Sequence, residues 1–166
     1  METIRLLLRI VVKEDAERIA EIRNSDFVMQ YNVMKKLTVE EIQEEIEHRK
    51  GSFYAIELKQ SHQVIGIINI SEDHMRYGVA AKCLSYYLDE AYTKQGYMKE
   101  ALARIVDYLF SIDIDVVSAR VFKNNLSSSK LLTSLGFIHE GTLRHCVKGI
   151  DGTIHDDLQF SIIKEK

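Results

Sequence analysis

The sequence has 166 residues, a length that suits one compact domain with its own core. Hydrophobic residues make up 46% and charged residues 28%, which is the balance of a folded globular protein rather than of a disordered chain. The formal net charge of -3 argues against nucleic acid as a general partner, and no apolar run approaches the roughly 20 residues that span a bilayer. We therefore predict a single domain over residues 1–166, with no nucleic-acid and no membrane partner.

The cysteines and histidines give no sign of a metal site. Cys83 and Cys146 lie far apart and match no metal-ligand spacing. His139, His145 and His155 also lack such a spacing, so we predict no metal. Charges interrupt the apolar start METIRLLLRI, and no cleavage-site pattern follows it. These features indicate a cytoplasmic protein with free thiols.

The first half of the chain alternates between strand and helix patterns. The run TIRLLLRIVV alternates as a strand does, and helical spacing after Lys13-Glu14-Asp15 predicts a short helix to about Asn24. A second helix follows Thr38-Val39-Glu40-Glu41, which has the form of a capping box. FYAIEL and VIGIINI flank the polar turn KQSHQ and predict a hairpin within residues 52–71.

The second half continues this alternation. A strand is expected over Cys83–Leu88, and the longest helix is expected from Tyr97 to Phe110 by its helical spacing. VVSARVF is strand-like, and residues 127–135 are helical up to Gly136. GFIHEGTLRHCV and TIHDDLQFSII flank residues 148–152 and predict a closing hairpin. The order is strand, two helices, three strands, helix, strand, helix and two strands, which defines one mixed α/β domain.

The segment from Tyr86 to Ala101 runs from a strand through a loop into a helix. Backbone N–H groups at a helix start lack intrahelical acceptors and, with the helix dipole, form an anion site. Gly96 allows close approach of a ligand, while Lys94 and Lys99 add positive charge, so a pyrophosphate would fit. The alternative is that Gly96 only makes the turn and the lysines are solvated, because a single glycine is weak evidence for phosphate.

The run YYLDEAYTKQGYMKEAL resembles the signature segment of the GNAT superfamily of N-acetyltransferases, and the RimJ/RimL-like (ribosomal-protein N-acetyltransferase-like) branch is the most similar. The resemblance places the family's Q/R-x-x-G-x-G/A loop on residues 93–98, where backbone amides would hold the pyrophosphate of acetyl-CoA. Thr93 departs from the family's basic or amide residue, and Met98 from its small one. The coenzyme-binding residues implied here are Lys94, Gln95, Gly96, Tyr97, Met98 and Lys99.

A second stretch, from Asn125 to Ser128 and on to Gly136-Phe137, resembles the family's N-x-x-S helix followed by LGF. It implies that Asn125 hydrogen-bonds the pantetheine arm and that Ser128 lies near the thioester sulfur. The alternative makes Asn125 or Ser127 a helix N-cap. Similar stretches occur at TIRLLLR, FYAIELKQSHQVIGIINI and DGTIHDDLQFSI, the last with Asp156 at the family's acidic position. The resemblance implies the GNAT fold, a mixed, mostly antiparallel central sheet of about seven strands flanked by about four helices.

The chemistry of acetyl transfer asks for three further groups. A backbone N–H must stabilise the oxyanion, and the family resemblance assigns this to the strand at Tyr87 and Leu88. The departing thiolate needs a proton or a hydrogen bond, and Ser128 is the catalytic candidate because Leu132 stands where many relatives have a tyrosine. An amine also needs deprotonation, but Cys83 occupies the position of the acidic base in relatives, so the base is unassigned.

Charged residues near the end of the predicted hairpin offer a second candidate feature. Glu72, Asp73 and His74 would attract a cationic amine if they lined a pocket. A charged hairpin tip is more often solvated, and we favour that interpretation for all three.

The resemblance predicts an enzyme that transfers acetyl from acetyl-CoA to a primary amine by direct attack in a ternary complex. The acceptor is either a protein N-terminal amine or a small amine such as a polyamine or an aminoglycoside. The alternative is an acyl-CoA-binding module without turnover, suggested by the missing tyrosine at Leu132 and the missing acid at Cys83. Dimers are common among such relatives, which leaves a homodimer open.

Overall fold

The computed structural model describes every residue except Met34, Lys50, Ile150 and Lys166. The chain forms two compact units. The first unit contains Met1–Asn69 and Tyr86–Arg104, and the second contains Ile70–Ser85 and Ile105–Lys166. The single domain expected over residues 1–166 stays a prediction.

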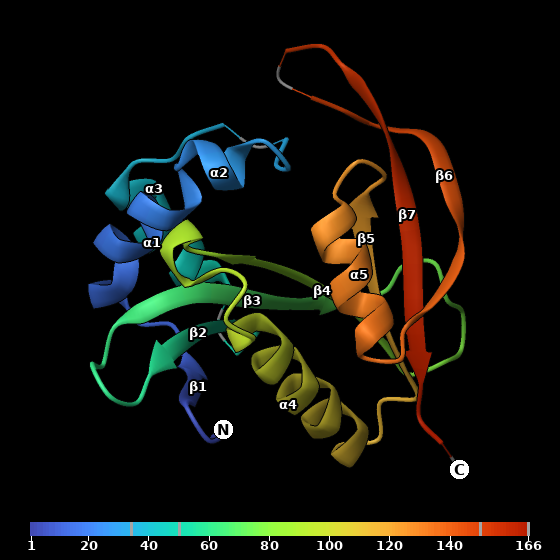
Figure 1. Ribbon diagram of the computed structural model, residues 1–166, viewed down its shortest axis with the longest axis horizontal. Helices are drawn as coiled ribbons and strands as arrows, with labels where there is room; N and C mark the ends of the chain where they lie inside the picture. The colour runs from blue at the N-terminus through green and yellow to red at the C-terminus, as the bar shows by residue number, and fades with distance from the viewer. Residues whose placement is uncertain (34, 50, 150, 166) are drawn as a thin grey trace. The chain divides into compact units, whose positions relative to one another are not determined.

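Seven strands form a sheet in the order β1-β2-β3-β4-β5-β7-β6 (Figure 1). The ladder between β4 and β5 is parallel, whereas β1 with β2, β2 with β3, β5 with β7 and β6 with β7 pair antiparallel. The strands are β1 (Leu6–Ile10), β2 (Phe53–Leu58), β3 (Val64–Glu72), β4 (Ala81–Leu88), β5 (Val116–Phe122), β6 (Ile138–Lys148) and β7 (Ile154–Ile163). This confirms the predicted mixed and mostly antiparallel sheet.

Helices occupy the connections that the sequence pattern predicted. The α-helices are α1 (Ala16–Arg23), α2 (Asp26–Met29), α3 (Val39–His48), α4 (Tyr97–Ser111) and α5 (Leu126–Ser134), with 3₁₀ turns at η1 (Lys13–Asp15) and η2 (Glu90–Tyr92). The described residues thus form five α-helices rather than about four. The additional one, α2, has four residues, which is too short to show a helical period.

In the first unit, helices α1 and α3 cover one face of β2 and β3, as Figure 1 shows. The start of α3 is fixed by the capping box read from the sequence. The Glu41 amide donates to Thr38 Oγ1 at 3.2 Å, and the Thr38 amide donates to Glu41 Oε2 at 2.9 Å. Two backbone donors that a helix start leaves unpaired are therefore satisfied.

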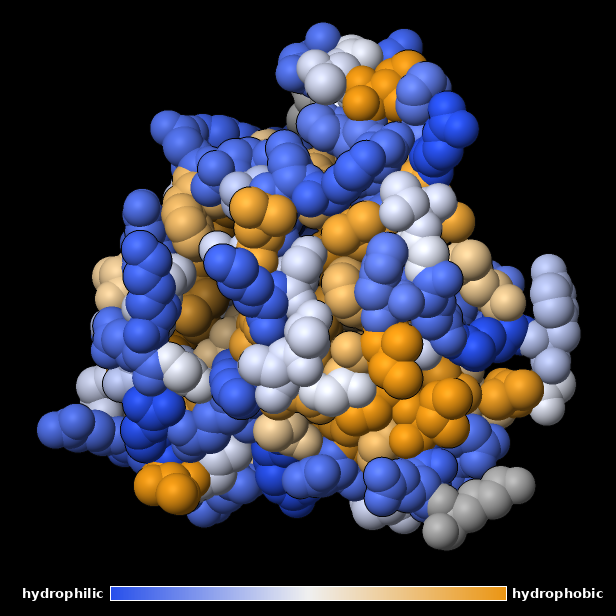
Figure 2. Space-filling view, turned by 45° about the vertical axis from the view of Figure 1, so that its right-hand side comes forward, coloured by the Kyte–Doolittle hydropathy of each residue, from blue (hydrophilic) through white to orange (hydrophobic). Residues whose placement is uncertain are grey.

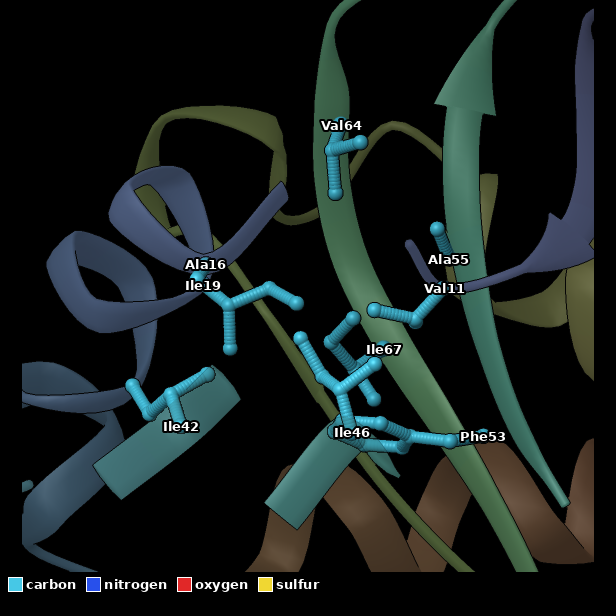
Figure 3. Packing of buried hydrophobic residues seen from close by; sticks show 9 residues of the cluster. All are labelled: Val11, Ala16, Ile19, Ile42, Ile46, Phe53, Ala55, Val64 and Ile67. Carbon is cyan, nitrogen blue, oxygen red and sulfur yellow. The ribbon is translucent and has the colours of Figure 1, made fainter. Parts of the chain in front are cut away.

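Apolar side chains from both layers meet in one cluster, drawn in Figure 3. Ile19 of α1 and Ile42 of α3 are fully buried against Ile67 of β3. The other members drawn are Val11, Ala16, Ile46, Phe53, Ala55 and Val64. Burying a side chain of the size of isoleucine contributes about 1.5–3 kcal/mol, so this cluster holds the helices on the sheet.

A charged network also lies in the first unit. Arg9 on β1 donates to both carboxylate oxygens of Asp15, at 2.7 and 2.8 Å, and to Glu57 Oε2 at 2.6 Å. The Val12 amide adds a fourth bond, to Asp15 Oδ2 at 2.9 Å. Burial raises the pKa of Asp15 and of Glu57, but the bonds from Arg9 outweigh it and hold both pKa values below the ordinary ones.

The second unit is built on β5, β7 and β6, with α5 packed beside the start of β6. The long hairpin of β6 and β7 matches the predicted closing hairpin, although Ile150 in its turn lies outside the described residues. Two irregularities interrupt the register, one between His139 and Gly141 and one between Leu143 and Val147. The edge strand β6 is therefore bulged at two places.

Figure 2 shows hydrophilic side chains over much of the visible face, with hydrophobic ones in several places and most densely toward the lower right. The most exposed large apolar residues of the second unit are Tyr77 at 90% and Ile138 at 70%. No described helix is both long enough and apolar enough to cross a bilayer.

Candidate active site

The loop before α4, in the first unit, carries a row of backbone donors. The amides of residues 94 to 99 find no acceptor among the described residues, and the first amide to bond along the helix is that of Glu100, to the Gly96 carbonyl at 3.0 Å. Lys94 and Gly96 have positive φ, 59° and 83°, while Gln95 between them does not. Alternation of this kind turns successive N–H groups toward one concave side and creates an anion site. The geometry fits a pyrophosphate.

Arg5 of the N-terminal segment holds this loop in place. Its guanidinium donates to the Gln95 carbonyl at 3.0 Å, lies 4.2 Å from the centre of the Tyr97 ring and pairs with Glu100 at 2.7 Å. Glu100 in turn accepts from Thr3 Oγ1 at 2.5 Å and from the Arg5 amide at 2.9 Å. The loop geometry is therefore fixed by residues that sequence analysis did not place in the site.

The remaining residues of this loop differ in exposure. Lys94, Gln95 and Lys99 are exposed, so the two lysine charges face solvent where an anion can reach them. Met98 is 8% exposed and belongs to the core. The side chain at 98 therefore points inward, so that only its backbone amide is available to a ligand.

Tyr87 and Leu88 at the end of β4 offer only their main chain. The Tyr87 ring packs against the cluster of Figure 3, and its hydroxyl is buried without a hydrogen-bond partner among the described residues. Burial raises the pKa of this phenol, so it stays protonated. Gly66 on β3 allows the main chain of Tyr87 to lie close to β3, because a Cβ at residue 66 would be only 2.6 Å from the Tyr87 carbonyl oxygen.

Asn125 and Ser128 lie in the second unit, at the start of α5. Asn125 is the N-cap, since its Oδ1 accepts from the Ser128 amide at 3.1 Å. The N-cap interpretation is thus confirmed for Asn125. The role in holding pantetheine stays a prediction, as does the role of Ser128. Leu132 is fully buried and acts as core.

Cys83 on β4 is half-buried. Burial raises the pKa of its thiol, and the nearby Asp73 carboxylate raises it further, while a hydrogen bond with Ser118 acts in the opposite direction. The side chain is a protonated thiol at neutral pH and is unsuited to act as a base.

The three charged residues at the end of β3 do not behave alike. Glu72 is largely exposed and pairs with Lys82, and His74 is exposed. The Asp73 side chain is 4% exposed and lies 3.4 Å from Arg76 Nε. The solvated interpretation therefore holds for Glu72 and His74 and is wrong for Asp73, because the loop folds its carboxylate against an arginine. Glu72, Asp73, His74 and Arg76 line a cleft of about 500 Å³.

The three C-terminal histidines serve structural contacts. The His155 ring stacks on Phe122 with centroids 4.6 Å apart, and His139 lies 5.2 Å from Phe160. His145 has positive φ at the second bulge of β6, where its amide donates to Asp156 Oδ1 at 2.9 Å. Within the described residues, no three His, Cys, Asp or Glu side chains gather as a metal site would require.

A loop with unpaired backbone amides among the described residues thus lies between β4 and α4 of the seven-stranded mixed sheet. The sequence profile described as "Acetyltransferase (GNAT) domain" matches residues 5–138, which include parts of both units. The chain belongs to the GNAT acetyltransferase family and is an acetyl-CoA-dependent N-acetyltransferase. The RimJ/RimL-like resemblance read from the sequence agrees with this assignment.

Individual relatives support the same assignment along the whole chain. The chain is 28% identical over 180 residues to the uncharacterized N-acetyltransferase YoaA of Bacillus subtilis (strain 168), covering 100% of this chain and 97% of the relative. The crystal structure of a GNAT-family acetyltransferase from Bacillus anthracis has a TM-score of 0.90 at 20% identity, covering 100% and 99% of the two chains. RimL, a ribosomal L7/L12 alpha-N-protein acetyltransferase in complex with coenzyme A, has a TM-score of 0.85 at 18% identity, covering 97% and 95%. At these identities the solved structures establish the fold.

Proposed function

We propose that the loop of residues 94–99 holds the pyrophosphate of acetyl-CoA and that the chain transfers the acetyl group directly to a primary amine in a ternary complex. The observation that carries the proposal is the row of six unpaired backbone amides at the start of α4. Unpaired amides at a helix start bind phosphate oxygens with the help of the helix dipole. Acetyl-CoA supplies the thioester that the amine attacks.

Several residues of this chain have a proposed role in such a reaction. Arg5 keeps the amide row in shape through the Gln95 carbonyl and the Tyr97 ring. A backbone N–H at Tyr87 or Leu88 is the proposed hydrogen-bond donor to the oxyanion. This main chain can lie close to β3 because Gly66 has no side chain. The leaving sulfur needs a proton, for which Ser128 is the proposed source.

Cys83 is a protonated thiol and does not serve as a base. The acceptor therefore binds as a neutral amine, or a bound water removes its proton. Positioning of two reactants can itself lower a barrier by about 7 kcal/mol or more. Turnover without a dedicated side-chain base is therefore physically reasonable. The proposed acceptor is a protein N-terminal amine, the substrate class in the name of the structural neighbour RimL, or a small amine.

The purified protein should release free thiol from acetyl-CoA when it is given a panel of primary amines and N-terminal peptides. The initial rate is followed by a thiol reagent against a control without enzyme. Tight coenzyme binding with no turnover on any acceptor would support the coenzyme-binding module instead.

Gly96→Asp should raise the coenzyme dissociation constant at least tenfold, which corresponds to about 1.4 kcal/mol. The reason is a negative charge added within the amide row, close to Arg5 Nη2, which would lie 3.4 Å from a Cβ at this position. The strain of a non-glycine residue at φ 83° adds to this effect. Gly152→Asp is the matched control, since Gly152 has the same φ of 83° and also lies in an exposed turn. Calorimetric titration with coenzyme A gives both constants. Equal affinities of the two variants would remove the loop from the proposed site.

Ser128→Ala should lower kcat at least tenfold and change the KM for acetyl-CoA less, because a thiolate that leaves without a proton is a poor leaving group. Ser127→Ala is the control, since Ser127 is its exposed neighbour on α5. Steady-state rates at several acetyl-CoA concentrations separate kcat from KM. Unchanged rates for Ser128→Ala would assign the residue a structural role only.

A further inference from the structure

One face of the second unit combines burial with polarity. On β7, Asp157, Gln159 and Ser161 alternate along the strand and are only 4%, 6% and 3% exposed. Their partners on β5 are Phe122, Arg120 and Ser118, which point to the same side of the sheet because paired residues share a face. We call this surface, made by β5, β6 and β7, the polar face.

One part of the polar face centres on the Glu140 carboxylate, which accepts several hydrogen bonds. Ser161 Oγ donates to Glu140 Oε1 at 2.7 Å, and Arg76 Nη2 donates to both Glu140 oxygens at 2.8 and 2.7 Å. Arg76 Nε also lies 3.4 Å from Asp73 Oδ2, although both of these buried atoms have no hydrogen-bond partner among the described residues. These contacts join the loop after β3 to the edge strand β6, and they leave the Glu140 carboxylate well compensated.

The neighbouring part is not satisfied. Asp157 Oδ1 and Gln159 Oε1 are buried and have no hydrogen-bond partner among the described residues. The other Asp157 oxygen is 3.7 Å from Arg120 Nε, which is too long for a hydrogen bond. A buried polar atom without a partner costs about 1–3 kcal/mol, so a native protein rarely keeps two of them side by side without a ligand or water to fill the need.

The same part of the face has room for a ligand. Gly141 on β6 pairs with Gln159, so a side chain at 141 would point to the polar face. A Cβ built at Gly141 meets no atom within 4 Å, and the backbone there does not have the positive φ that would demand glycine. The glycine thus leaves open space on the polar face, at the position of β6 that pairs with Gln159.

Charge decides what kind of ligand can enter. Three carboxylates, Asp73, Glu140 and Asp157, share this side of the unit with two guanidinium groups, Arg76 and Arg120. Burial raises the pKa of Asp157, while Arg120, Cys146 and His155 act in the opposite direction without overcoming it. Both unpaired atoms are hydrogen-bond acceptors. A ligand that complements them must donate hydrogen bonds and carry positive charge.

We propose that Asp157 Oδ1, Gln159 Oε1 and the space over Gly141 form a subsite for an ammonium or guanidinium group that belongs to the acceptor molecule and is distinct from the amine that receives the acetyl group. The inference rests on the proposed function and deepens it. The preferred acceptors then carry a second positive charge. Bonds between a charged donor and a carboxylate are about twice as strong as neutral ones, so the charge of the ligand should dominate selection.

A binding experiment without acetyl-CoA tests the subsite by itself. The probes are propylguanidine and its neutral isostere propylurea, followed by NMR at the amides of Gly141 and Gln159 and at the carboxyl carbon of Asp157. Propylguanidine should shift these signals and bind at least tenfold more tightly than propylurea. Equal binding of the two probes, or shifts no larger than those caused by sodium chloride at the same ionic strength, would overturn the proposal.

Two variants and one control sharpen this result. Asp157→Asn should reduce propylguanidine binding at least tenfold by removing the charge, and Gly141→Leu should reduce it similarly by filling the space. Asp156→Asn is the matched control, because Asp156 is the adjacent residue on the opposite face of β7 and its Oδ1 bond to the His145 amide can be kept by asparagine. Thermal unfolding confirms that each variant is folded. Loss of binding in the control equal to that in Asp157→Asn would count against the subsite.

Measurements of turnover distinguish a failure of the proposed subsite from a failure of the proposed acetyltransferase function. With acetyl-CoA, 4-aminobutylguanidine should be acetylated with a kcat/KM at least tenfold above that of pentylamine, and Asp157→Asn should bring this ratio close to one. The acetylation rates of a tetrapeptide with arginine at its second position and of its citrulline analogue are then compared. They show whether the second charge is recognised in a peptide or only in a small amine. If no amine is acetylated, the proposed function fails while the NMR titration still decides the subsite. A ratio near one in the unaltered protein would overturn the subsite although the enzyme is active.

Discussion

In the first unit the Arg9 guanidinium bridges the buried carboxylates of Asp15 and Glu57, and both carboxyl pKa values lie below their ordinary values. In the second unit the equally buried Asp157 has its nearest guanidinium at 3.7 Å and one oxygen without a partner, and burial raises its pKa. The chemistry of the side chains is the same in the two regions. What differs is whether the protein itself completes their hydrogen bonds.

This difference separates a structural role from a binding role. A saturated network needs no further partner, and its removal should affect folding. An unsaturated pair costs free energy in the folded protein and is kept only when it serves another purpose, as binding sites commonly do. The free energies of unfolding of variants in both regions can therefore test this difference.

The largest effect is expected for Arg9→Met. The variant leaves two buried carboxylates without their cation, and loss of one partner of a buried ion pair costs about 3–5 kcal/mol. Urea unfolding at pH 7 measures the change. Arg144→Met, at an exposed position of β6, is the control and should be close to neutral. A small loss for Arg9→Met would show that the network is not structural.

Asp15→Asn should cost about 2 kcal/mol at neutral pH, since it removes charged hydrogen bonds that the Asp15 side chain makes while only 9% exposed. The folded-state pKa of Asp15 is depressed, so its stabilisation is present above the unfolded pKa and is lost as the pH falls through the folded pKa. The difference between variant and unaltered protein should therefore shrink below about pH 4. Unfolding curves from pH 7 to pH 2.5 test this sign.

Asp157→Asn should change the free energy of unfolding least of the three variants, and it should increase rather than decrease it at neutral pH. The folded-state pKa is raised, so the protonated form is favoured in the fold and stability is lost as the pH rises through that pKa. The neutral variant should be as stable as the unaltered protein at low pH and more stable at pH 7, by up to about 1 kcal/mol. A destabilised variant at pH 7 would mean that the charge of Asp157 is satisfied in the folded protein, and the contrast between the two units would disappear.

Long elements with a clear period were predictable from the sequence. The capping box at Thr38, the apolar spacing of residues 97–110 and the strand VVSARVF each became the expected element, because burial of one face imposes the pattern locally. Helix α2 was missed because four residues cannot display a helical period. Most boundaries differed by one or two residues, as at β4, which begins at Ala81 rather than Cys83, whereas β1 begins three residues after the start of the predicted run.

The polar face was not predictable by the same argument. In DDLQFSII the polar residues alternate with Leu158, Phe160 and Ile162, a pattern that ordinarily places the polar side toward solvent. Here Asp157 and Gln159 are nearly as buried as Phe160. Their burial depends on long-range partners such as Arg120, and a local pattern carries no information about those.

The loop of residues 94–99 falls between these cases. Its glycine and its place before a helix were visible in the sequence, whereas the contribution of Arg5 was not, because that residue lies about ninety positions away from Gln95 and contacts it only in the fold. The available signals were a basic residue within an apolar strand pattern and the resemblance of the stretch TIRLLLR to the family.

The two bulges of β6 bear on how copies of this chain can assemble. Strand β6 forms one edge of the sheet, and a regular edge offers free backbone groups to any passing strand. The breaks at residues 139–141 and 143–147 interrupt the even spacing that a docking strand would need, and the Asp156 side chain already occupies the His145 amide. Continuous extension of the sheet by a second copy along β6 is thus disfavoured.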